Sequence, residues 1–167
     1  MAEDENPEGA AAGGEAPRQI QIQKIYLKDA SFESPASPGI FGQENLNPKF
    51  ELNIAARSQP AGDNLHEVVI TVTVDARQDD KHVFVAEVQQ AGLFTISGFN
   101  QEELEAMLGA FCPNQLYPFA RERLMSLVSQ GGFPPPQLHP VNFERIYAEE
   151  RRRKKEEGAA GADAGNA

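Results

Sequence analysis

Residue types that commonly carry catalysis are few in this sequence of 167 residues. A nucleophile, a base or a metal ligand would have to come from the single cysteine, Cys112, or from the histidines His66, His82 and His139. No HxH or HExxH spacing joins the histidines, as a metal site on one strand or helix would require. Cys112 with His139 is therefore the one pair that could act as nucleophile and base, as in a cysteine hydrolase.

Cys112 also has a structural interpretation. It follows the apolar segment 104–111, where a free thiol behaves as a small hydrophobe. Gly92, Gly98 and Gly109 are too scattered for a phosphate-binding loop, since neither GxGxxG nor GxxxxGK[ST] occurs. We therefore predict no catalytic residue, no metal site and no cofactor.

The composition narrows the classes of partner and compartment. The chain has 25 acidic and 15 basic residues and a net charge of -10, which opposes attraction to nucleic acid and anionic lipid. A single cysteine excludes an internal disulfide and fits a reducing compartment. The N-terminus lacks the basic and apolar stretches of a signal peptide, and no apolar run approaches the ~20 residues of a membrane-spanning helix. We expect a cytoplasmic protein that does not insert into a membrane.

Three regions follow from the distribution of residue types. Residues 1–18 are acidic and small, with too few apolar groups to offset the entropy of ordering, so we expect a disordered tail. Residues 19–147 carry the patterns of one folded domain. Residues 148–167 are expected to form a charged helix end and a flexible tail, with Glu149 and Arg153 at the i,i+4 spacing that supports an exposed helix.

Four segments alternate apolar and polar residues as β-strands do. They are 19–29, 49–57, 65–77 and the first part of 82–99. Turn residues 78–80 join the last two segments in a hairpin. Short links between consecutive strands predict an antiparallel sheet.

Glu87 interrupts a strand face that Val83 and Val85 would otherwise make apolar. A charge costs several kcal/mol if it is buried without a partner, so we expect this face to be open to water or to another protein. In the first strand, unbroken alternation would place on one face Ile20, Ile22, Lys24 and Tyr26.

The sequence period changes from 2 to 3.6 after residue 99. Asn100 and Glu103 have the spacing of a capping box. Four apolar residues then share one face of a helix predicted at 101–111: Leu104, Met107, Leu108 and Phe111.

Prolines predict the remaining helix boundaries. Pro113 disfavours helical geometry in the residue before it and is expected to end the first helix. A second helix is expected from Pro118 to Gly131, and a short last one within 141–147. The predicted fold class is α+β, with a four-stranded antiparallel sheet followed by two main helices.

The connection between the first two strands is unusually apolar. It offers Phe32, Ile40, Phe41 and Leu46 in a stretch whose three prolines keep it out of the sheet. These side chains could plug the core, or they could line a groove.

Four segments in this order resemble the SecB family of protein-export chaperones. They read KDxSFE, EVQQxGxF, GAxCPNxLxPxAR and PVNF, and lie within residues 19–147. The basic run at 151–155 matches no family feature. The resemblance implies a chaperone that needs no ATP, keeps unfolded secretory precursors competent for translocation and delivers them to the SecA motor.

The resemblance also implies an assembly. Family members are homotetramers, dimers of dimers in which helices lie between the sheets. By this likeness the apolar face of helix 101–111, with Leu104, Met107, Leu108 and Phe111, would form the tetramer interface.

Two sets of site residues follow from the resemblance alone. The SecA-binding patch would comprise Asp29, Glu33, Val85 and Glu87, facing a short basic SecA tail whose zinc belongs to SecA. The client-binding surface would comprise Phe41, Leu46, Leu52, Ile54, Phe84, Tyr117 and Phe119. Leu46 stands where family members commonly have tryptophan. A related holdase serving other clients, such as a toxin–antitoxin system, remains an alternative.

Overall fold

The computed structural model describes residues 16–163, and it describes side chains as far as residue 160. The tail predicted to be disordered, residues 1–18, lies almost wholly outside the described residues, as does the end of the chain after residue 163.

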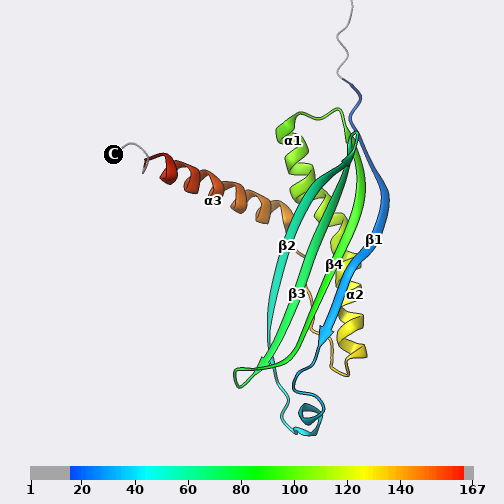
Figure 1. The fold of residues 1–167 in the computed structure, drawn as a ribbon, viewed down its shortest axis with the longest axis vertical. Helices are drawn as coiled ribbons and strands as arrows, with labels where there is room; N and C mark the ends of the chain where they lie inside the picture. Colours follow the sequence, from blue (N-terminus) through cyan, green and yellow to red (C-terminus); the bar gives the residue numbers. More distant parts are fainter. Residues whose placement is uncertain (1–15, 164–167) are drawn as a thin grey trace, which may run out of the picture.

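Four long strands form a single antiparallel sheet (Figure 1). They are β1 (Gln19–Glu33), β2 (Lys49–Gly62), β3 (Leu65–Gln78) and β4 (Lys81–Ser97), in the spatial order β1-β4-β3-β2. The predicted hairpin between β3 and β4 is present, with Asp79 and Asp80 at positive φ angles of 52° and 60° in its turn. Aspartate tolerates this left-handed region better than most residues. The α+β fold class and the four-stranded sheet are confirmed.

Strand β1 departs from the predicted alternation. Register shifts occur between Ile22 and Lys24 and again between Leu27 and Asp29. Each β-bulge adds one residue to β1 and moves the following side chains to the other face. The prediction that Ile20, Ile22, Lys24 and Tyr26 share a face is therefore wrong for the last two, because the first bulge separates them from the isoleucines.

The two predicted helices are continuous. Helix α1 (Gln101–Ala106) passes through a π-helical turn, η2 (Met107–Phe111), into α2 (Cys112–Gln130). The expected capping box holds α1 at its start, since the Asn100 side chain accepts from the Glu103 N–H at 2.9 Å and Glu103 accepts from the Asn100 N–H at 3.1 Å. The helix ends at Gly131, as predicted.

Pro113 does not end the helix, so that prediction is wrong. The Cys112 N–H bonds to the carbonyl of Met107, an i→i+5 bond, and Pro113 follows in the first turn of α2. Proline lacks an N–H and normally clashes with the carbonyl four residues earlier, and the wider π turn accommodates both effects. Pro118 lies inside α2 rather than at its start.

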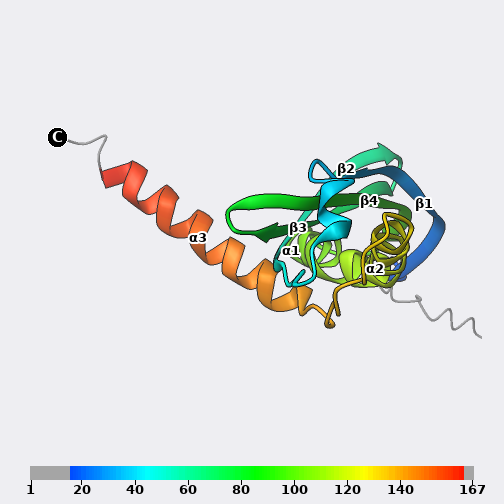
Figure 2. The same cartoon turned by 90° about the horizontal axis from the view of Figure 1, so that it is seen from below.

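The last helix, α3 (Phe143–Asp163), joins the short helix expected within 141–147 and the charged helix end expected after it into one long helix. It leaves the body of the molecule at an angle and projects away from it (Figures 1 and 2). Arg153 pairs with Glu157 at 3.8 Å rather than with Glu149, which accepts from Arg145 at 2.9 Å. Among the described residues, no helix is long and apolar enough to span a membrane.

The core lies between the sheet and the α1–α2 rod, which covers one face of the sheet (Figure 2). Fully buried side chains of β3 and β4 meet those of α2: Val68, Ile70, Val72, Val74, Phe84, Phe94, Leu116, Leu124 and Val128. Each such side chain contributes about 1.5–3 kcal/mol by leaving water. The opposite face of the sheet carries no helix among the described residues (Figure 2).

Candidate functional site

The uncovered sheet face, here called the open face, brings the predicted patch residues together. In the register between β1 and β4, Asp29 lies opposite Gln89, Ser31 opposite Glu87, and Glu33 opposite Val85. Side chains paired in this way stand about 5 Å apart on the same face. Asp29, Glu33, Val85 and Glu87 therefore form one continuous surface, here called the acidic patch.

Exposure agrees with the charge of the acidic patch. Asp29 and Glu33 are exposed, and Val85 and Glu87 are half-buried. Glu87 also accepts a hydrogen bond from the Thr73 hydroxyl at 2.9 Å. The face that carries Glu87 is open, as its charge predicted.

Asp75 extends the negative surface toward β2. It lies opposite Val85, in the same cross-strand row as Glu33. Arg77 and His82 donate to its carboxylate at 2.9 and 2.8 Å. Burial alone would raise the pKa of Asp75, but these hydrogen bonds outweigh it and hold the pKa below its ordinary value.

Farther along the open face lies a buried carboxylate that sequence reasoning missed. Glu67 of β3 is 6% exposed. It accepts hydrogen bonds from Lys28 at 2.8 and 2.9 Å, from the Tyr26 hydroxyl, and from the Gln59 amide at 2.6 Å. These donors, Lys28 first, lower the pKa of Glu67 to about 2, while the bond to Glu67 raises the pKa of Tyr26 to about 12. We call these four residues the Glu67 cluster.

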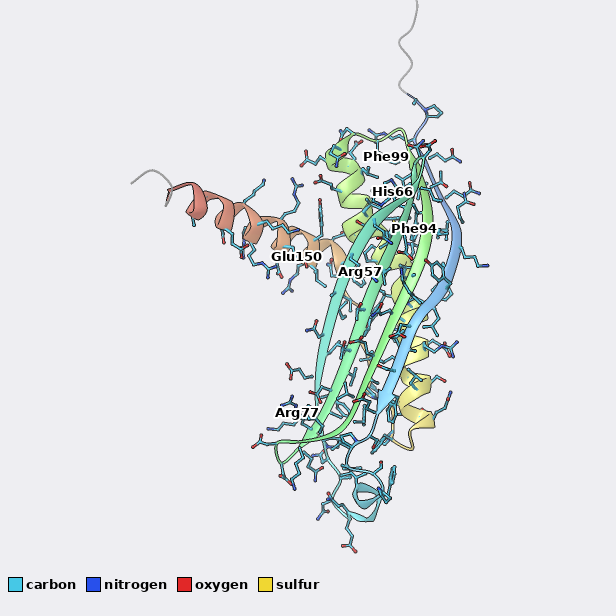
Figure 3. The ribbon with its side chains drawn as sticks, viewed as in Figure 1. Arg57, His66, Arg77, Phe94, Phe99 and Glu150 are labelled. Atoms are coloured by element: carbon cyan, nitrogen blue, oxygen red, sulfur yellow. The ribbon has the colours of Figure 1, made fainter. Side chains whose placement is uncertain are left out.

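The three histidines do not converge. His66 lies opposite Phe94 at the end of the sheet near α1, while Arg77 marks the other end (Figure 3). His82 pairs with Arg77 across β3 and β4, and so lies at that other end. His139 belongs to the proline-rich connection before α3 and is exposed.

Cys112 has the structural role that its apolar surroundings suggested. Its side chain is fully buried, and burial raises the pKa of the thiol to about 12. The thiolate, which would be the nucleophile, is therefore strongly disfavoured at neutral pH.

On the helix-covered side, apolar surface stays exposed along both edges of the sheet. Helix α2 packs on the central strands β4 and β3 and leaves the outer strands partly uncovered. Large apolar side chains of these outer strands are 40–45% exposed: Ile22 and Leu27 on β1, Phe50 and Leu52 on β2. We call them the apolar margins. Of the predicted client residues, Leu52 lies in the β2 margin and Ile54 beside it is half-buried.

The apolar connection between β1 and β2 both plugs the core and presents a surface. In its short helix η1 (Gly39–Gly42), Ile40 is 5% exposed and packs in the core, whereas Phe41 is 53% exposed. The Phe41 ring stacks on Phe133 with centroids 5.2 Å apart. Leu46 is half-buried against the core.

Two predicted client residues offer no surface in the protomer. Phe84 is fully buried among aromatic rings, with its centroid 4.9 Å from that of Phe133. Tyr117 is 4% exposed and donates to the His139 carbonyl at 2.8 Å, which holds the proline-rich connection against α2. Phe119, two residues along, is 49% exposed and lines a hollow with Leu27 and Pro118.

The predicted interface stripe is only partly used within the protomer. Leu104, Met107, Leu108 and Phe111 are half-buried against the core. The remaining apolar surface of the rod is available to another chain.

Comparison with known proteins identifies the family of the chain. The sequence model described as "Preprotein translocase subunit SecB" matches residues 13–154. The chain belongs to the SecB family. It is 46% identical over 161 residues to the protein-export protein SecB of Nitrosococcus oceani, covering 96% of this chain and 98% of the relative. It is 48% identical over 160 residues to the SecB of Chromohalobacter salexigens, covering 93% and 96%.

A solved structure supports the SecB fold. The SecB-like chaperone of Mycobacterium tuberculosis, in complex with a ChAD peptide from the HigA1 antitoxin, matches with a TM-score of 0.60. The match covers 73% of this chain and 90% of that one, at 23% sequence identity.

Proposed function

We propose that this SecB-family protein is a cytoplasmic export chaperone that holds unfolded precursor proteins and delivers them to SecA without using ATP. The observation that carries the proposal is the division of the protomer into two surfaces. Uncovered apolar side chains lie on the helix side, and the acidic patch lies on the opposite side of the sheet. A client and a partner could thus be bound at the same time.

Client binding would use the exposed apolar residues. Phe41, Leu52 and Phe119 are 43–53% exposed, and each contact with a client side chain contributes at most about 1.5–3 kcal/mol before ordering costs. One contact is too weak to hold a chain. A long polypeptide that reaches several such sites gains effective concentration, which strengthens binding by about 10²–10⁴. Folded proteins bury such side chains, so this mode of binding selects unfolded chains.

Assembly supplies the repetition that this binding mode needs. We propose a homotetramer, a dimer of dimers, with the α1–α2 rods between the sheets. The half-buried stripe of Leu104, Met107, Leu108 and Phe111 supports this arrangement, because another rod packed on it would complete its burial.

The acidic patch would bind the basic tail of SecA. Asp29, Glu33 and Glu87 place three carboxylates on the open face, and Val85 lies opposite Glu33, so that the patch offers both charge and an apolar contact. Complementary charge steers association and selects the partner more than it adds affinity.

The test is the charge reversal Glu87→Lys. It should leave assembly mass and client binding unchanged and weaken SecA binding, measured by isothermal titration calorimetry, by about tenfold or more. The matched control is Glu122→Lys, an exposed residue of helix α2 on the opposite side of the sheet from the acidic patch. Equal SecA affinities for the two variants would refute the assignment of the patch.

A second candidate function is suggested by the M. tuberculosis neighbour, whose bound peptide comes from an antitoxin. A holdase for a toxin–antitoxin pair would use the same apolar margins for a different client. Identification of the polypeptides that copurify with the tagged protein separates the two. Secretory precursors support export, and an antitoxin supports the alternative.

A further inference from the structure

The second bulge of β1 determines which face Asp29 and Glu33 occupy. Before this bulge, Lys24 and Tyr26 point to the open face and Leu27 to the helix side, as their register with Leu93, Ala91 and Gln90 requires. Continued alternation would turn Asp29 to the helix side. The bulge adds one residue, Lys28, and thereby returns Asp29 and Glu33 to the open face.

Lys28, the extra residue, is tied to the Glu67 cluster. Its ammonium group contacts both oxygens of the Glu67 carboxylate, at 2.8 and 2.9 Å. Tyr26, two residues earlier, donates to the same carboxylate. Glu67 thus holds β1 at the bulge and just before it, although β4 lies between β1 and β3.

Glu67 is itself firmly placed. Gln59 of β2 donates to its second oxygen at 2.6 Å, so the carboxylate joins three strands. It is buried, and charge-assisted hydrogen bonds to a buried carboxylate are stronger than neutral ones. A carboxylate with such partners holds the Lys28 side chain, and with it the bulge, in one position.

We propose that Lys28 and Glu67 are positioning residues for partner docking, which fix the β1 bulge so that Asp29 and Glu33 align with Glu87 in the acidic patch. The inference rests on the proposed binding of SecA at that patch. Neither Lys28 nor Glu67 need contact SecA.

Positioning and simple electrostatics predict opposite effects for one substitution. Lys28→Met removes a positive charge from the open face, so charge alone would strengthen the binding of a basic partner. Loss of the contacts that Glu67 makes with Tyr26 and Lys28, here called the clamp, would instead free the bulge and misalign the carboxylates. Lys24→Met removes the same charge from the same face of β1, at an exposed residue with no recorded partner among the described residues.

The experiment measures SecA affinity by titration calorimetry for Lys28→Met, Lys24→Met and Lys28→Arg. We expect Lys28→Met to weaken binding by about tenfold, the loss typical of a hydrogen bond to a charged group. Lys24→Met should bind as tightly as the unchanged protein or more tightly, and Lys28→Arg should restore most of the affinity. Equal or tighter binding by Lys28→Met than by Lys24→Met would overturn the inference.

Two further variants separate a positioning role from general instability of the fold. Tyr26→Phe loosens the clamp without changing charge and should also weaken SecA binding, whereas Val128→Ala opens a cavity in the core and should leave it unchanged. If Val128→Ala weakens SecA binding as much as Tyr26→Phe does, the positioning role is refuted.

The Glu87→Lys variant separates failure of the positioning role from failure of the patch itself. If it loses affinity while Lys28→Met does not, only the positioning role fails, and if it keeps affinity, the proposed function fails as well.

Discussion

At the scale of single residues, two glutamates on the same face show how differently a charge can be accommodated. Glu67 is buried and satisfied by Lys28, Tyr26 and Gln59. Glu87 is half-buried, and within the described residues its recorded hydrogen bond comes from Thr73. The first arrangement orders the sheet, and the second leaves a carboxylate free to meet a partner.

Sequence alone could not distinguish these glutamates. Both lie within a strand and precede a valine, in HEVV and VAEV. Their difference comes from the neighbouring strand, because Tyr26 and Lys28 reach Glu67 only in the register that the β1 bulges create. Likewise the resemblance assigned Phe84 and Tyr117 to the client-binding surface, yet their burial depends on how β4, α2 and the last connection pack.

The burial of Cys112 gives a residue-scale prediction. With a pKa of about 12 in place of 9, its thiolate fraction at pH 8 is lower by about a thousandfold. Iodoacetamide should therefore label the native protein very slowly at pH 8. It should label the protein rapidly in about 8 M urea, which unfolds it and exposes the thiol. Because the folded pKa is raised, this thiol favours the fold below pH 9, and its contribution is lost as the pH rises toward 12. Fast labelling of the folded protein at pH 8 would contradict the buried placement.

At the scale of elements, the rod α1–η2–α2 determines where α3 leaves the molecule. Gly109 lies in the π turn, and the Tyr147 ring of α3 packs directly on its Cα. Arg151 donates to Glu102 of α1 at 3.1 Å. Beyond Arg151, the side chains of α3 are exposed as far as they are described. The helix is therefore anchored near its first three turns.

Gly109→Ala tests that anchor. The added methyl group would overlap the Tyr147 ring, and overpacking of this kind costs about 1–3 kcal/mol. Hydrogen exchange at the amides of residues 145–151 should accelerate by about tenfold or more. The control is Gly158→Ala, where the new methyl group meets nothing within 4 Å. Unchanged exchange in Gly109→Ala would show that this contact does not hold α3.

Regular elements were predictable and their irregularities were not. Strict alternation identified β3, and the spacing of Asn100 and Glu103 identified the start of α1. The π turn before Pro113 and the bulges of β1 were missed, because each arises where tertiary packing outweighs local preference. A charged helix end was expected after residue 148, but its continuity with the helix expected within 141–147, and its extent to Asp163, were not, since this polar sequence lacks the apolar periodicity of a packed helix.

At the scale of the whole molecule, one narrow rod covers a sheet that is wider than the rod. The central strands are buried beneath it, and the apolar margins on β1 and β2 stay exposed. A chain that functioned alone would be expected to cover such surface or replace it with polar residues. The exposed apolar margins account for the proposed holding of unfolded clients. The half-buried apolar stripe of the rod accounts for the proposed assembly of protomers.

The most direct test is static light scattering of the purified protein, alone and after a denatured secretory precursor is diluted into it. We expect a mass of four chains for the protein alone. With the precursor we expect a larger, stable complex, and scattering that stays low while the precursor in buffer aggregates. If the precursor aggregates as fast with the protein as without it, the exposed apolar surface does not bind unfolded polypeptides and the central claim is wrong.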